Sequence, residues 1–193
     1  EFAFAHSSIE YFSFPPKLSK ISDRTFEYCN KLRYVEITAD SNLQIIGISA
    51  FEKSSIEGIS LPSNLIIICK FAFSGCNNLI NIEIPNESKL KIIEEGAFSQ
   101  GGIEKFIVPR NLLKITENTF YRSNLSKIEI PDDSKLKTIE KSAFAYTSIE
   151  SLTIPSNCVE LKEGWCIGTN KLKEIKISTS NPKYICYNNE MIL

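Results

Sequence analysis

LINIEIPNESKLKIIEEGAFSQGGIEKFIVP, residues Leu79–Pro109, is the stretch that decides the fold of this chain. It begins with the pattern apolar-x-x-apolar-x-apolar-Pro over Leu79–Pro85 and repeats this pattern over Ile103–Pro109. Between the two copies lie an apolar pair, Leu90 and Ile93, and the dipeptide Ala97-Phe98. Self-similarity at a period of about 20 to 50 residues is the signature of a repeat architecture. The sequence therefore predicts a repeat protein.

The aromatic residue of the Ala-Phe dipeptide recurs along the whole chain. Its spacing alternates, with intervals of 22, 25, 22, 25, 22, 24 and 22 residues, so the true unit is a pair of repeats of about 47 residues. Ala or Thr precedes the anchor in the first seven repeats, which indicates a cramped site beside the ring. The anchors are Phe4, Phe26, Phe51, Phe73, Phe98, Phe120 and Phe144, with Cys166 in the eighth place.

A strand-like hexamer follows each anchor. Its last three residues alternate apolar, polar and apolar, which is the period of a strand with one buried face. Proline, which cannot donate a hydrogen bond to a strand ladder, follows six of the eight hexamers and marks the end of the strand. The hexamers are Ile9–Phe14, Leu32–Ile37, Ile56–Leu61, Leu79–Ile84, Ile103–Val108, Leu125–Ile130, Ile149–Ile154 and Leu172–Ile177.

A second apolar pair precedes each later anchor, and we expect it on the return side of the coil. No segment has an amphipathic helical run, so short strands, turns or 3-10 pieces must form this side. The sequence predicts a right-handed solenoid with a parallel β-sheet on one face and about eight coils, alternately of 22 and 24–25 residues. We expect residues 1–193 to form one domain and residues 181–193 to form a terminal hairpin around Asn188-Asn189.

Composition and charge restrict the classes of function. The hydrophobic fraction of 42% and the charged fraction of 23% are ordinary for a folded protein. A net charge of −1 argues against a nucleic-acid partner. The longest apolar run, Leu65–Cys69, is far shorter than the roughly 20 residues of a membrane helix. The chain starts inside a repeat and without Met, so we expect it to be an excerpt of a longer chain.

The cysteine pattern does not predict disulfides or a zinc site. Cys29 and Cys76 occupy the same position of two repeats, and 76 − 29 = 47 residues separate them. At about 4.8 Å per strand, two coils place them roughly 10 Å apart, beyond the limit of about 7 Å between the Cα atoms of a disulfide. We expect buried thiols that pack as small hydrophobes. With one histidine and no C-x-x-C motif, no metal or cofactor is predicted.

Three repeated motifs carry a resemblance to a known family. IGISAFEKSSIEGISLP (Ile46–Pro62), FSGCNNLINIEIP (Phe73–Pro85) and IEKSAFAYTSIESLTIP (Ile139–Pro155) resemble the leucine-rich repeats of BspA-like surface proteins. The resemblance covers nearly the whole chain, and the alternating lengths and the closing NPKY are similar to the expanded sets of such proteins in microbial eukaryotes. Trp165-Cys166 replaces Ala-Phe, which predicts a last full coil that differs locally from the others.

The resemblance implies a function as well as a fold. It implies a secreted or cell-surface protein that recognises host or microbial surface proteins, with adhesion to matrix proteins and coaggregation among the roles of the class. It implies no enzymatic activity. We therefore expect a protein ligand, no cofactor, and no insertion of this segment into a membrane.

The residues that could carry chemistry are few. We expect His6, the single histidine, to be a solvated turn residue. The adjacent carboxylates of Glu94-Glu95 and Asp132-Asp133 fall in turns, whereas a glycosidase needs two carboxyl groups facing each other across a cleft. Gly101-Gly102 lacks the other residues of a phosphate-binding loop. Two glycosylation sequons are present, of which the first lies in a long turn and the second reaches into a strand: Asn86-Glu87-Ser88 and Asn124-Leu125-Ser126.

The outer face of the predicted sheet is the surface with a systematic character. Each hexamer shows three outward residues, so three columns of side chains run along the sheet. Glutamate alternates between the first and third columns, which solubility explains as well as binding does. Exposed tyrosine and isoleucine are more suggestive, because tyrosine is favoured at binding hot spots and solenoids bind through extended surfaces. The candidate ligand-binding residues are Tyr11, Arg33, Tyr34, Glu36, Ile80, Asn81, Lys105, Ile107, Lys127 and Glu129.

Two other functions compete with a protein-binding module. One is a structural spacer within a larger surface protein. The other is a β-helix enzyme that acts on polysaccharides, since such enzymes also stack short strands. That activity would need acidic groups that converge on one sheet, whereas the acidic residues here are spread evenly along the coils.

Overall fold

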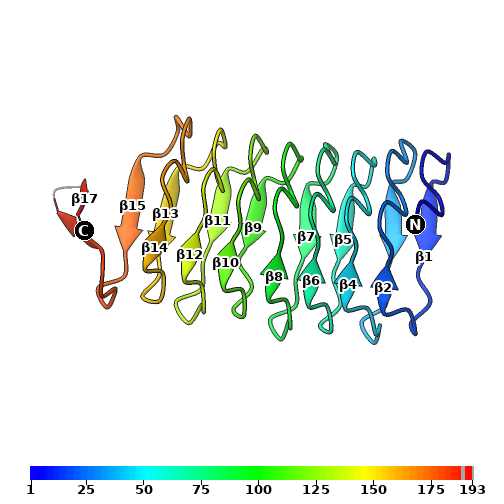
Figure 1. The fold of residues 1–193 in the computed structure, drawn as a ribbon, viewed down its shortest axis with the longest axis horizontal. Helices are drawn as coiled ribbons and strands as arrows, with labels where there is room; N and C mark the ends of the chain where they lie inside the picture. Colours follow the sequence, from blue (N-terminus) through cyan, green and yellow to red (C-terminus); the bar gives the residue numbers. More distant parts are fainter. Residues whose placement is uncertain (188–189, 193) are drawn as a thin grey trace.

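The computed structural model describes residues 1–187 and 190–192, and it confirms the predicted solenoid of parallel strands (Figure 1). In this described part, eight short strands follow one another along one face: β1 (Tyr11–Ser13), β3 (Tyr34–Glu36), β5 (Gly58–Ser60), β7 (Asn81–Glu83), β9 (Lys105–Ile107), β11 (Lys127–Glu129), β13 (Ser151–Ile154) and β15 (Glu174–Ile177). Seven two-residue strands form the return side: β2 (Lys20–Ile21), β4 (Ile45–Ile46), β6 (Ile67–Ile68), β8 (Ile92–Ile93), β10 (Lys114–Ile115), β12 (Thr138–Ile139) and β14 (Glu160–Leu161). The two termini lie at opposite ends of the row (Figure 1).

The solenoid has seven complete turns, slightly fewer than the eight expected. The eighth face strand, β15, has no return strand among the described residues, because the chain then enters β16 (Ile185–Tyr187). β16 pairs antiparallel with β17 (Glu190–Ile192), and the expected turn at Asn188-Asn189 lies outside the described residues. The described residues contain no helix, so the returns consist of short strands and turns.

Neighbouring face strands pair in parallel and in register within three hydrogen-bonded groups. Tyr34 pairs with Tyr11 on one side and with Gly58 on the other, and Gly58 pairs in turn with Asn81. The hydrogen-bonded groups are β1–β3–β5–β7, β9–β11 and β13–β15. The register survives the alternating coil lengths because the extra residues of the longer coils lie in turns, for example at residues 85–89.

The anchor phenylalanines stack on one another through the centre of the solenoid. From Phe4 to Phe144, successive ring centroids lie 5.2–5.7 Å apart with interplanar angles of 2–14°. The six rings from Phe26 onward are at most 1% exposed. The small residue that precedes each ring is also buried, as at Ala72 and Ala97, so a larger side chain has no space there. Each coil therefore buries its ring only by stacking on its neighbours.

The column of rings ends in a coil that differs locally from the others, as Trp165-Cys166 in place of Ala-Phe predicted. The backbone keeps the expected register, because the amide of Phe144 donates to the carbonyl of Trp165 as earlier anchors donate to the residue before the next anchor. However, the side chain that covers the last ring is that of Trp165, which packs edge-on against Phe144 with centroids 6.2 Å apart. Cys166, in the eighth anchor position, is only half-buried. The indole therefore contacts Phe144 as the next phenylalanine contacts each anchor ring in the earlier coils.

Each coil turns sharply on both sides of its anchor. The residues two positions before and two positions after the anchor have φ between 52° and 70° in all eight coils, and twelve of these sixteen residues are not glycine. This left-handed conformation costs an ordinary residue about 1–2 kcal/mol. Hydrogen bonds to the next coil hold it in place; the amide of Lys53, for example, donates to the carbonyl of Ser74 at 2.8 Å.

Buried polar side chains tie the coils together at two corners. Cys29 and Cys76 donate their thiols to the carbonyls of Phe4 and Phe51 in the preceding coil, at 3.0 and 2.9 Å. Both cysteines are buried and free, which confirms the expectation for them. At the opposite corner, asparagine side chains donate to backbone carbonyls of the preceding coil at 2.8–3.0 Å: Asn64 to Ser41, Asn111 to Ser88 and Asn157 to Ser134.

Candidate binding surface

The outer face of the sheet presents three columns of side chains, as the sequence predicts. Strand register and backbone hydrogen bonds between neighbouring coils define them. The first column is Glu10, Arg33, Glu57, Ile80, Glu104, Ser126, Glu150 and Lys173. The second is Tyr11, Tyr34, Gly58, Asn81, Lys105, Lys127, Ser151 and Glu174. The third is Ser13, Glu36, Ser60, Glu83, Ile107, Glu129, Thr153 and Lys176.

In the first four coils, hydroxyl groups hold the carboxylates of the face. Tyr34 donates its hydroxyl to Oε2 of Glu57 at 2.8 Å, while Nη1 of Arg33 lies 3.3 Å from Oε1 of the same residue. Tyr11 donates its hydroxyl to Glu36. The hydrogen bond from Tyr11 lowers the pKa of the Glu36 carboxyl, and the bond to Glu57 raises the pKa of the Tyr34 phenol. Both carboxylates therefore have a tyrosine hydroxyl as a hydrogen-bond donor on the outer face.

In the fifth and sixth coils, lysines take over this role. Lys105 and Lys127 both place Nζ 3.1 Å from Oε1 of Glu129. Hydrogen bonds from Lys105, and then from Lys127, lower the pKa of the Glu129 carboxyl. Because all three side chains are open to solvent, such pairs contribute little to stability. The charges here largely compensate one another.

The structure places all ten candidate residues on the outer face, but it divides them into two groups. The tyrosines, Arg33, Glu36, Ile80 and Asn81 lie on the first four coils, and Lys105, Ile107, Lys127 and Glu129 lie on the separate β9–β11 sheet. The apolar and aromatic members each leave 47–55% of their surface accessible: Tyr11, Tyr34, Ile80 and Ile107. Whether these residues bind a ligand stays a prediction.

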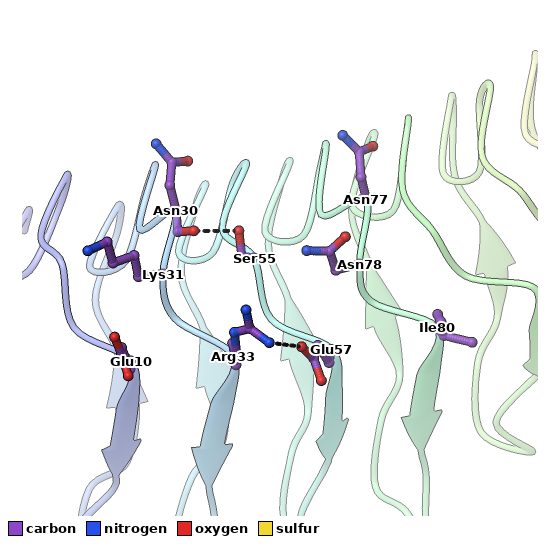
Figure 2. Close-up of a pocket in the computed structure, with 9 residues that line it drawn as sticks. All are labelled: Glu10, Asn30, Lys31, Arg33, Ser55, Glu57, Asn77, Asn78 and Ile80. Carbon is purple, nitrogen blue, oxygen red and sulfur yellow. Dashed lines mark hydrogen bonds and ion pairs between the residues drawn. The ribbon is translucent and has the colours of Figure 1, made fainter.

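The sequence did not predict that a groove crosses part of this face. A groove of about 820 Å³ crosses the ends of the first four coils (Figure 2). Its lining includes Asn30, Ser55 and Asn77, which were not candidates, together with Arg33 and Ile80, which were. A sequence signal did exist: five residues separate Phe51 from Ile56, whereas six separate the anchor from the hexamer in both neighbouring coils.

The residues singled out for possible chemistry have structural surroundings that account for them. The ring of His6 stacks on Tyr28 with centroids 5.0 Å apart. Glu94 accepts the amide of Lys70 at 3.0 Å, and Glu95 pairs with the Lys70 ammonium at 3.2 Å. Arg110 pairs with Asp133. Within residues 1–187 and 190–192, no group of three histidine, cysteine or acidic residues is placed to hold a metal ion.

Three of the thiols, those of Cys69, Cys76 and Cys158, stay protonated at neutral pH. Burial raises the pKa of Cys76 to about 12 and the pKa values of Cys69 and Cys158 to about 11 each. A thiol is a weak nucleophile compared with a thiolate. These three groups therefore act as packing and hydrogen-bonding side chains.

The first sequon differs from the second in its surroundings. Asn86 is exposed in a turn, and Ser88 is buried with its hydroxyl accepting the amide of Leu90 at 3.2 Å. In the second sequon Asn124 and Ser126 are exposed, but the central Leu125 is fully buried. A search for a helix that could cross a bilayer finds none among the described residues.

Comparison with known proteins identifies the repeat type. The family model that describes a BspA type leucine rich repeat region, in six copies, matches residues 1–123 and 86–190. No match was found among curated proteins.

Two solved structures give the same fold. A leucine rich cell surface protein from Faecalibacterium prausnitzii superposes with a TM-score of 0.82 at 21% identity, over 95% of this chain and 51% of its own. A leucine-rich repeat protein from Bacteroides ovatus superposes with a TM-score of 0.74 at 23% identity, over 92% and 52% of the two chains. The chain thus spans about half the length of these two proteins.

Proposed function

Since the chain belongs to the BspA-type leucine-rich repeat family, we propose that it is a non-enzymatic protein-binding module of a cell-surface or secreted protein. Its ligand in this proposal is a surface protein of a host or of another microbe, bound through the outer face of the sheet. The binding provides adhesion. One of the structurally similar proteins is itself described as a cell surface protein, which supports this location.

The observation that carries the proposal is the exposure of apolar side chains on the sheet face. Tyr11, Tyr34, Ile80 and Ile107 each leave about half of their surface in solvent, from 47% to 55%. Folding does not account for them, because the interior is already filled by the stacked phenylalanines and the Leu and Ile side chains around them. Exposed tyrosine and isoleucine lose surface to a partner at little conformational cost, which suits a protein interface.

A binding screen tests this function. The chain is passed over immobilised matrix proteins and mucins, and dissociation constants are measured for the wild type, Tyr34→Ala and Ile80→Ala. The matched control is Leu113→Ala, an exposed leucine before the return strand β10. Binding should weaken about tenfold or more in the two face variants and should not change in the control. Equal binding by all four proteins would remove the sheet face from the account, and no binding to any ligand of the panel would favour a spacer.

A further inference from the structure

The outer surface of the third coil is recessed between its two neighbours. Three adjoining grooves, of about 820, 500 and 310 Å³, follow this coil from its turn to the end of its strand. Residues between 55 and 63 take part in the lining of all three grooves. The second and fourth coils form the walls, and Glu10 of the first coil also lines the largest groove. We call this continuous hollow the third-coil trough.

Two features of the sequence create the trough. The third coil reaches its strand one residue sooner after its anchor than the second and fourth coils do, so its turn is lower than theirs. Apart from Glu57, its outward side chains are also small: Gly58 pairs with the larger Tyr34, and Ser60 pairs with the larger Glu83. The trough therefore runs along the strand direction, across the row of coils.

Gly58 is not required by the backbone. Its φ is not in the left-handed region, and a Cβ at this position would meet only the carbonyl oxygen of Asn81, at 3.6 Å. An alanine would fit. Glycine inside a strand weakens the strand and often marks a place where another chain approaches closely. Here its effect is to leave a gap in the second column between Tyr34 and Asn81.

The middle and lower grooves of the trough are acidic. Among the described residues, Glu36, Glu57, Glu83 and Glu87 line them, and no lysine, arginine or histidine does. Tyr34 and Ser60 donate hydroxyls to Glu57 and Glu83, at 2.8 and 2.5 Å, and so fix two of the carboxylates beside the gap.

The excess negative charge of the outer face is confined to the first four coils. There the three columns hold four glutamates and one arginine, an excess of 4 − 1 = 3 negative charges. In the last four coils the same columns hold four glutamates and four lysines, so the difference is zero. The comparison covers the 24 outward positions of the three columns, twelve in the first four coils and twelve in the last four. A positively charged partner is therefore favoured at the first four coils of the face and not at the last four.

The upper groove supplies free amides. The side chains of Asn30, Asn77 and Asn78 stand on its walls (Figure 2), and none of the three amides has a hydrogen bond to another described residue. Asn64 and Asn111, by contrast, are tied to backbone carbonyls of the preceding coil. A primary amide both donates and accepts, which matches the backbone of an extended peptide.

We propose that the third-coil trough binds an extended segment of a protein partner and seats one of its arginine or lysine side chains over Gly58, among Glu36, Glu57 and Glu83. The free asparagine amides bind the backbone of the same segment. An extended chain fits because alternate side chains, about 6.7 Å apart along a strand, point to the floor of such a trough. This inference rests on the proposed function and names the partner's chemistry at that face.

The test uses a fluorescent heptapeptide of alternating serine and arginine, and the same peptide with citrulline in place of arginine. Citrulline keeps the shape of the side chain and removes its charge. Fluorescence anisotropy gives the dissociation constants for the wild type, Gly58→Ala, Gly58→Leu and Glu83→Gln. The matched control is Ser151→Leu, which places the same leucine side chain in the same column four coils further along.

The expected order follows from the geometry. The arginine peptide should bind the wild type about tenfold more tightly than the citrulline peptide, and Gly58→Leu should weaken it about tenfold by filling the gap. Glu83→Gln should weaken it about threefold, and Gly58→Ala and Ser151→Leu should leave it unchanged. Equal affinities for wild type and Gly58→Leu, or an equal loss in Ser151→Leu, would overturn the proposal. Circular dichroism confirms that each variant is folded, and Glu83→Gln carries the test if Gly58→Leu does not fold.

The proposed function can survive the failure of this inference. If Tyr34→Ala abolishes binding to a ligand of the panel while Gly58→Leu leaves both that binding and peptide binding unchanged, the sheet face binds proteins but the trough does not seat a basic segment. If neither variant affects any binding, both proposals fail.

Discussion

The column of anchor rings inside the solenoid and the outer columns of the sheet obey different rules. The inner column is nearly uniform, because phenylalanine stacks on phenylalanine from Phe4 to Phe144. The second outer column, by contrast, varies along the row, for example from Tyr34 to Gly58 to Asn81. The backbone register is the same for both. The difference teaches that folding fixes the interior of each coil and leaves its outer face free to vary, so stability is distributed while any recognition is local.

The largest expected effect comes from opening the interior. Phe73→Ala removes a ring that stacks on Phe51 and Phe98 at 5.2 and 5.5 Å, and we expect it to lower the free energy of unfolding by about 3–5 kcal/mol. Tyr34→Ala, which removes a ring of similar size from the outer column, should change it far less. Urea denaturation followed by circular dichroism measures both. Comparable losses would erase the distinction between the two columns.

Two glycines provide a second comparison between the buried interior and the outer face. A Cβ at Gly102 would lie 2.1 Å from the carbonyl oxygen of Asn77, whereas at Gly58 the nearest atom is 3.6 Å away. Gly102→Ala should therefore destabilise the protein by about 1–3 kcal/mol, the usual cost of overpacking. Gly58→Ala should leave the midpoint of thermal unfolding unchanged or raise it slightly. The comparison fails if both variants melt at the same temperature.

The stability of the buried interior should also depend on alkaline pH, because of the thiol of Cys76. Burial raises its pKa from the ordinary 9.0 to about 12, so above pH 9 the unfolded chain loses this proton before the folded one does. Stability should then fall with rising pH, by at most about 1.4 kcal/mol per pH unit from this group, until the folded thiol also ionises near pH 12.

Cys76→Ser is the matched variant, because serine occupies the same position at Ser54 and Ser123. Its unfolding free energy should fall less steeply between pH 9 and pH 11 than that of the wild type, since serine does not ionise there. Parallel curves for the two proteins would show that the thiol is more accessible than its burial indicates.

The smallest effect is expected at the corners, which are exposed but conformationally constrained. Gln100 has a φ of 53°, and its side chain is open to solvent. Gln100→Gly should raise the free energy of unfolding by about 0.5 kcal/mol, because relief of the left-handed strain slightly exceeds the added entropy of the unfolded chain. Gln100→Ala is the control and should not stabilise. A lower free energy of unfolding for Gln100→Gly than for the wild type would show that the left-handed conformation of residue 100 is not strained.

The fold could be predicted because its determinants repeat. The Phe anchors, the apolar hexamers and the prolines each occur several times, and insertions confined to turns leave their order intact. The three outward columns followed from strand alternation alone. The corners could not be predicted, because Arg24, Lys53 and Gln100 are not residues that favour positive φ. Only the hydrogen bonds between coils impose that conformation.

The candidate surface was predicted in position but not in shape. Tyr34 and Ile80 were identified because apolar groups on an outward column stand out in a sequence. The trough was missed because it depends on three coils together: a short turn and Gly58 in one, and larger side chains in both neighbours. Trp165 was likewise assigned to the small position beside the anchor, whereas its ring covers Phe144.

The most direct test of the account measures stability and binding on the same set of variants. Phe73→Ala, Tyr34→Ala and Ile80→Ala are compared by urea denaturation and by affinity for a ligand identified in the binding screen. The account predicts that the two outer variants lose affinity and keep their denaturation midpoint, while Phe73→Ala lowers the midpoint sharply. It is contradicted if the outer variants unfold as readily as Phe73→Ala, or if they bind the ligand as tightly as the wild type.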